Sequence, residues 1–175
     1  MNQDQEITSR SATHLFSGTE EEILTHLEGL REEGSLASLG AIMEHLTTTP
    51  SLPVKSKILS LIADIKIPGA AAIVANFTFA CTNHSIQQEL ISASWQSRLD
   101  FSPYFNRYIE LAIAGEMMLV LDVLSLVEEC CEKIDSKHTK AAISDIKQHL
   151  PSFEDKKQVL MTDLLTLLEA KMDVD

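Results

Sequence analysis

The chain is built from short helix-forming segments separated by proline, glycine and capping residues, and one construction occurs twice. In its first copy, an apolar helical pattern that contains Ile58 ends at Pro68 and a second helical pattern follows. In the second copy, Leu90 lies 32 residues after Ile58, and Pro103 lies 35 residues after Pro68. Proline interrupts a helix but is favoured in its first turn, so each proline marks a corner between two helices. Helix pairs that recur at this period are typical of an α-solenoid, in which neighbouring pairs bury each other's apolar faces.

Capping signals divide the rest of the chain into further helices. Thr19 with Glu22 and Ser85 with Gln88 have the spacing of a capping box, and Ser102 precedes Pro103 as a helix cap would. Apolar residues recur at helical spacing after each of these signals. The predicted helices span about residues 19–34, 35–46, 53–66, 69–81, 85–99, 103–114, 116–133, 137–150 and 151–171.

Length and composition predict one folding unit. The chain has 175 residues, of which 45% are apolar and only 5% aromatic, so its core is built from aliphatic side chains that pack well on helices. We therefore expect an all-α fold, an α-solenoid (superhelix) of about four stacked antiparallel helix pairs plus a C-terminal helix. The solenoid domain is expected over residues 19–172, after a flexible N-terminal tail over residues 1–18.

Charge and cysteine content limit the partners and the compartment. Residues 1–50 carry nine acids and two bases, residues 51–115 four and five, and residues 116–175 thirteen and seven. An acidic chain without a basic stretch repels phosphate groups, so we expect neither nucleic acid nor a membrane as partner. The first ten residues do not resemble a signal peptide, and three cysteines are too few for a disulfide framework. A cytoplasmic location is expected.

Two segments resemble HEAT-like repeats. They are "SLPVKSKILSLIADIKIPGAAAIVANFTFA" and "HSIQQELISASWQSRLDFSPYFNRYIELAI", each of which has a helix, a tight proline corner and a second helix. The resemblance covers roughly residues 20–150. The Trp, Gly, Tyr and Ala positions of tetratricopeptide repeats are not matched, although their period is similar. Resemblance to small HEAT-like proteins implies a scaffold that binds other proteins.

The sequence contains no phosphate-binding glycine loop, nucleophile elbow or metal-binding pair of histidines or cysteines. We therefore expect a protein that is not an enzyme and needs neither a cofactor nor a metal. An alternative function is histidine phosphotransfer at His26, because "THLEGLREEG" is partly similar to the motif of phosphotransfer domains. The motif has a Lys and then a Gly after its His, whereas Glu28 and Gly29 stand here. A phosphorylated His26 would then face like charge.

Aromatic and arginine side chains gather in the middle of the chain. Such side chains dominate binding hot spots, and this region is neutral while both ends are acidic. The alternative interpretation is that most of the aromatic residues are ordinary core. The candidate partner-binding residues are Trp95, Arg98, Tyr104, Arg107 and Tyr108.

The last helix offers a second route to association. It carries a wide apolar stripe that either closes the end of the solenoid or pairs with another copy of the chain. The stripe consists of Leu160, Leu164, Leu165, Leu168 and Met172. In the predicted helix over residues 116–133, Cys130 and Cys131 point about 100° apart, so one is expected to face the core and the other to face away from it. Whether either has a redox role is left open.

Overall fold

The computed structural model describes residues 16–48 and 50–172, and the regular secondary structure of this part of the chain is entirely helical. It contains nine α-helices and three short 3₁₀ helices without any strand, which confirms the predicted all-α class. Residues 1–15 of the predicted flexible tail lie outside the described residues. The fold divides into two compact units, the first ending at Leu99 and the second starting at Asp100. The single domain over residues 19–172 stays a prediction.

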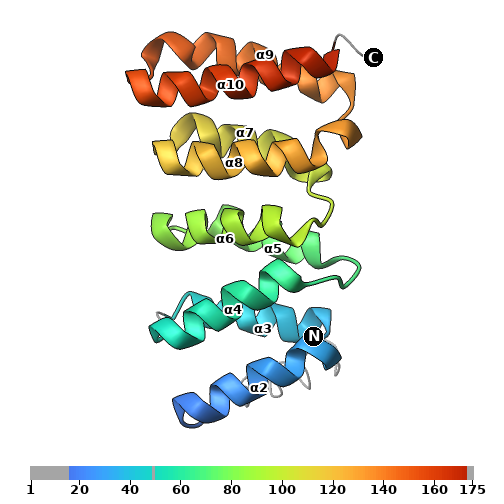
Figure 1. The fold of residues 1–175 in the computed structure, drawn as a ribbon, viewed down its shortest axis with the longest axis vertical. Coiled ribbons are helices and arrows are strands. Elements are labelled where there is room, and N and C mark those ends of the chain that lie inside the picture. The colour runs from blue at the N-terminus through green and yellow to red at the C-terminus, as the bar shows by residue number, and fades with distance from the viewer. Residues whose placement is uncertain (1–15, 49, 173–175) are drawn as a thin grey trace, which may run out of the picture. The chain divides into compact units, whose positions relative to one another are not determined.

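The first unit has two layers of helices. One layer contains α2, α4 and α6, with α4 packed against both others, and the second contains α3 packed against α5 (Figure 1). Helices α3 and α5 also contact α4 and α6, respectively. The helices are α2 (Glu20–Glu33), α3 (Leu36–Leu46), α4 (Leu52–Asp64), α5 (Ala70–Ala80) and α6 (His84–Ser97).

The second unit contains two helical hairpins. Helix α7 packs against α8 and α9 against α10, while α7 also contacts α9 and α8 contacts α10 (Figure 1). These hairpins are shifted by one helix from the pairs that the repeated construction predicted. The helices are η1 (Ser102–Tyr104), α7 (Phe105–Ala114), α8 (Met117–Cys130), η2 (Cys131–Lys133), α9 (Ser136–His149), η3 (Leu150–Ser152) and α10 (Asp155–Met172).

Aliphatic side chains fill both units, and the apolar stripe of the last helix belongs to this core. Leu164, Leu165 and Leu168 are buried within the second unit, where α10 packs against α8 and α9. Leu160 and Met172, at the ends of the stripe, are half-buried, and self-association through the last helix stays a prediction. None of the helices in the described ranges combines the length and the apolar content that crossing a bilayer requires.

The predicted helix caps are partly correct. Thr19 and Glu22 form the capping box, since the Glu22 carboxylate accepts from Thr19 N–H at 2.7 Å and Thr19 Oγ1 accepts from Glu22 N–H at 3.3 Å. The cap of α6 is Asn83 and not Ser85, because Asn83 Oδ1 accepts the N–H of Ser85 at 3.1 Å. Helix α7 begins three residues after Ser102, which lies in η1. Asparagine is among the strongest N-caps, which explains the earlier start of α6.

Two acidic caps make stability dependent on pH. The backbone N–H of Thr19 lowers the pKa of Glu22 from its usual value of 4.5, and the backbone N–H of His138 lowers that of Asp135 from 3.8. A lowered folded-state pKa adds stability that is complete above the usual pKa and is lost as pH falls through the lowered value. We therefore expect the thermal midpoint to fall as the pH drops below 4.5.

The variant Glu22→Gln/Asp135→Asn tests this expectation by thermal unfolding at a series of pH values. Glutamine and asparagine keep the two helix caps but do not titrate. The acid-induced fall in the midpoint should be smaller in the variant than in the natural chain. An identical fall in both proteins would assign the acid sensitivity to other carboxyl groups.

Pro68 and Gly69 form a tight turn between α4 and α5. Ala70 N–H donates to Ile67 C=O at 3.1 Å, and Gly69 has φ 86° and ψ −8°. These are the features of a type II turn in which Pro68 is the second residue and Gly69 the third. The third residue needs a positive φ, which favours glycine because other L-residues are strained there. Pro68 therefore lies in the corner, as predicted, and α5 starts two residues later.

Candidate functional site

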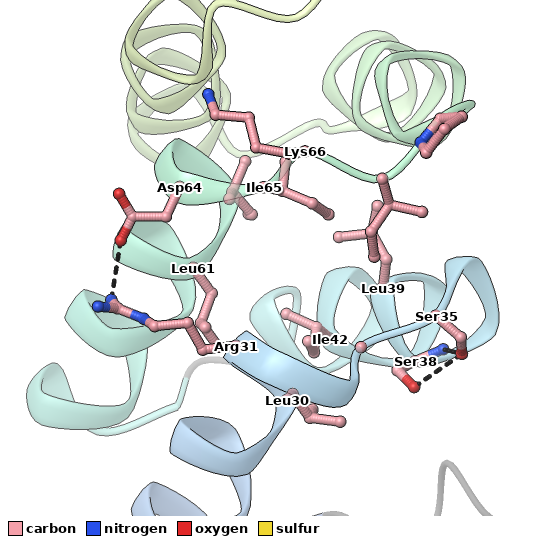
Figure 2. Close-up of a pocket in the computed structure, with 14 residues that line it drawn as sticks. Leu30, Arg31, Ser35, Ser38, Leu39, Ile42, Leu61, Asp64, Ile65 and Lys66 are labelled. Carbon is pink, nitrogen blue, oxygen red and sulfur yellow. Dashed lines mark hydrogen bonds and ion pairs between the residues drawn. The ribbon is translucent and has the colours of Figure 1, made fainter.

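A pocket of about 420 Å³ lies in the first unit where α2, α3 and α4 meet. Its walls are the C-terminal ends of α2 and α4, the first half of α3 and the turn that leads to Pro68 (Figure 2). The connection between α2 and α3 abuts that turn, since a Cβ on Gly34 would lie 3.7 Å from Ile67 Cδ1. The pocket is therefore built by three helix ends and two short connections.

The walls of the pocket are mostly aliphatic. Leu39, Ile42 and Leu61 have side chains that belong to the core of the first unit, and they form its floor. Ile65 and Ile67 come from the extended segment after α4 and are half-buried. The apolar lining residues are Leu30, Leu39, Ile42, Leu61, Ile62, Ile65, Ile67 and Pro68. Concave apolar pockets of about 300–1,000 Å³ are the usual form of a ligand-binding site.

Polar groups occupy the rim of this pocket. The Arg31 guanidinium lies 2.9 Å from the Asp64 carboxylate and donates to Ser60 Oγ at 3.2 Å. Ser35 and Ser38 have their hydroxyl oxygens 3.0 Å apart, and Figure 2 shows this pair away from the ion pair. The rim thus combines one ion pair, a pair of hydroxyls and Lys66, whose ammonium group donates to Ser97 C=O, and the lining contains neither His nor Cys.

The predicted partner-binding residues of the first unit lie at the end of α6. Trp95 is half-buried, and among the described residues its indole Nε1 is buried without a hydrogen-bond partner. Arg98 is exposed and caps α6 with φ 55° and ψ 23°, a left-handed conformation that is unfavourable for a residue other than glycine. The Arg98 side chain is free to contact solvent or a partner, whereas Trp95 offers only part of its ring.

The other three predicted residues lie in the second unit. Tyr104 is half-buried and Arg107 is exposed, and both line a smaller pocket of about 200 Å³ together with Lys133 and His138. Tyr108 is fully buried and its ring lies edge-on to Phe101, with centroids 6.0 Å apart. We therefore exclude Tyr108 from any partner-binding surface, since a core side chain has no area left for a partner. The role of the other four stays a prediction.

The residues that the sequence offered as candidates for a chemical role lie on different helices and do not form one site. His26 is exposed on α2, where Glu22 is close enough for the two charges to interact, and no base lies between residues 19 and 30. Cys130 is buried and Cys131 half-buried, in line with the different directions expected for them. Burial raises the pKa of the Cys130 thiol to about 12. Within the described ranges, no group of His, Cys, Asp and Glu is arranged to hold a metal ion.

Comparisons with protein-family models, with curated proteins and with solved structures find no match to this chain. The HEAT-like resemblance therefore rests on the two quoted segments alone. The pocket of the first unit was not among the sequence-predicted sites. Its signal lay in "DIKIP", where Ile65 and Ile67 alternate with Lys66 at the two-residue period of an extended segment instead of the helical period.

Proposed function

We propose that this chain is a non-catalytic protein-binding module whose helix pairs stack as an α-solenoid. The observation that carries the proposal is the aliphatic pocket between α2, α3 and α4. Its lining offers apolar contact on the floor, and the charged groups and hydroxyls on the rim are engaged by other groups of the chain. Such a lining suits anchoring of apolar side chains from a partner and provides no nucleophile with an adjacent base.

The two layers within the first unit support the solenoid part of the proposal. Helix α2 packs on α4 and α4 packs on α6, which is the contact pattern of stacked helix pairs. In the second unit α7 contacts α9 and α8 contacts α10, which repeats that pattern with two pairs. Stacking of this kind leaves the ends of the helices and their connections at the surface, where the pocket opens.

Filling the pocket tests the proposed function. Ser38 is half-buried in the pocket wall, and only its backbone N–H is needed by the Ser35 cap of α3. In the Ser38→Phe variant the larger ring should occupy the pocket and reduce capture of a partner from native cell lysate at least about tenfold, or 1.4 kcal/mol. Capture is measured by quantitative mass spectrometry of proteins retained on the immobilised chain.

The matched control is Ala37→Phe, because Ala37 is the adjacent residue of α3, is exposed and does not line the pocket. The control should capture the same partner as the natural chain, and both variants should keep the helical circular dichroism spectrum. Arg98→Glu/Arg107→Glu tests the surface predicted from the sequence in the same assay. Equal capture by the natural chain and Ser38→Phe would remove the pocket from the proposal.

A further inference from the structure

Helix α8 exposes an unusual amount of apolar side-chain area. Six large apolar side chains are exposed in the described part of the chain. Three of them belong to α8 and lie within its first five residues. Met117 is 37% exposed, Met118 48% and Leu121 41%. Clustered exposed apolar residues mark interaction sites more often than single ones do.

Helical geometry places these side chains on one face together with two glutamates. At about 100° per residue, Met117, Leu121 and Glu128 fall within about 40° of one another around the helix axis. Met118 and Glu129 lie along the edge of the same face, and all five residues are exposed. We call these five residues the α8 face. It is apolar near the start of the helix and anionic near its end.

The remainder of α8 and the residues next to it in the sequence add no positive charge. Residues 116–131 contain four acids and no Lys or Arg. The neighbouring helix α10 contacts α8 and exposes Val159, which is 61% exposed, between Asp155 and Asp163, together with Lys156. The ammonium group of Lys157 is engaged by the carbonyl oxygens of Ile113 and Gly115, at 2.6 Å each. This contact also places the start of α10 beside the start of α8.

Charge complementarity identifies what this face can bind. A partner must bring apolar side chains to the methionines and Leu121, and positive charge to Glu128 and Glu129. A second copy of this chain is a poor occupant, because each copy has a net charge of −12. The segments outside the described residues do not fit either, since 1–15 contains two acids and one base and 173–175 contains two acids and no base. Methionine side chains adapt to different apolar partners.

We propose that the α8 face binds a basic amphipathic helix of a partner protein, with the partner's apolar side chains on Met117, Met118 and Leu121 and its Lys or Arg residues at Glu128 and Glu129. This surface lies in the second unit and is independent of the pocket proposed for the first unit. Binding through apolar contact and unlike charge has a defined signature. It weakens when either component is removed, and its charge component weakens with salt.

The test uses synthetic helical peptides as probes. One peptide has leucines at helical spacing on one face and lysines on the opposite face, and the second has glutamate in place of every lysine. Binding to the full chain is measured by fluorescence anisotropy at physiological salt. The Leu/Lys peptide should bind at least about tenfold more tightly than the Leu/Glu peptide, and Met118→Ser/Leu121→Ser should weaken its binding about tenfold or more. Glu128→Gln/Glu129→Gln should weaken it several-fold and reduce its dependence on salt.

Matched controls separate the α8 face from general attraction to an acidic protein. Glu20→Gln/Glu21→Gln removes the same charge from the exposed start of α2, and Leu52→Ser removes an apolar side chain that is 73% exposed on α4. Neither change should alter Kd, and neither should the pocket variant Ser38→Phe. Equal losses in the control and α8 variants, or equal binding of both peptides, would overturn the proposal. So would a dimer in sedimentation equilibrium that Met118→Ser/Leu121→Ser makes monomeric, because a second copy would then be the occupant.

Discussion

Replacement of Phe105 by alanine should lower the free energy of unfolding by about 3–5 kcal/mol, the typical range for removal of a buried aromatic ring. Phe105 is only 1% exposed and begins α7, where it is one of the largest fully buried side chains of the second unit. The loss combines the transfer free energy of the ring with the cavity that remains, because packed helices collapse only partly around a void. Denaturant unfolding followed by far-UV circular dichroism measures the change.

The adjacent residue Tyr104 provides the control for this prediction. Tyr104 is also aromatic but is half-buried on the wall of the smaller pocket. Tyr104→Ala should therefore destabilise the chain clearly less than Phe105→Ala. Similar losses for both variants would mean that burial does not distinguish the two rings, and the assignment of Phe105 to the core would be wrong.

The second large effect is expected at Lys157. Its ammonium group donates to the carbonyl oxygens of Ile113 and Gly115 at 2.6 Å each and lies 4.4 Å from the centroid of the Phe153 ring. These carbonyls end α7 and have no helical partner of their own, as at the end of any helix. Lys157→Met keeps the aliphatic stem but removes the donor, so the free energy of unfolding should fall by about 1.5–3 kcal/mol.

Lys156→Met is the matched change for Lys157→Met. Lys156 is the preceding residue of α10, is exposed, and loses the same charge on substitution. The free energy of unfolding of the Lys156→Met variant should differ from that of the natural chain by less than about 0.5 kcal/mol, the usual range for a surface substitution. A loss of equal size in both variants would indicate that net charge, and not the two carbonyl contacts, determines the effect.

Most of the helical framework could be predicted because its signals are local. Apolar periodicity and the capping box of Thr19 with Glu22 gave all nine described helices, and most of their ends, to within a few residues. The errors lie where two capping residues compete within a few positions. Asn83 caps α6 in place of Ser85, and α10 begins at Asp155 because the segment containing Pro151 forms a 3₁₀ turn instead of the first turn of the helix.

The pairing of helices and the candidate site depend on contacts that no local pattern contains. The repeated construction joined α6 with α7, whereas the second unit forms its hairpins from α7 with α8 and α9 with α10. The aliphatic pocket needs Leu30, Ile42 and Ile65, which come from three different segments, to converge. Tyr108 shows the same limit, because the sequence left open whether this aromatic residue belongs to the core or to a binding surface, and the structure buries it.

The three cysteine thiols differ in burial, so a thiol-specific reagent should modify some of them and leave another unmodified in the natural chain. Because the pKa of Cys130 is raised to about 12 and its side chain is buried, almost none of it is thiolate at neutral pH, and alkylating reagents should leave it unmodified. Cys81 and Cys131 are only partly covered. One lies directly after α5 in the first unit and the other directly after α8 in the second. Each unit therefore carries its own attachment point for a fluorescent or paramagnetic label without any substitution in the sequence.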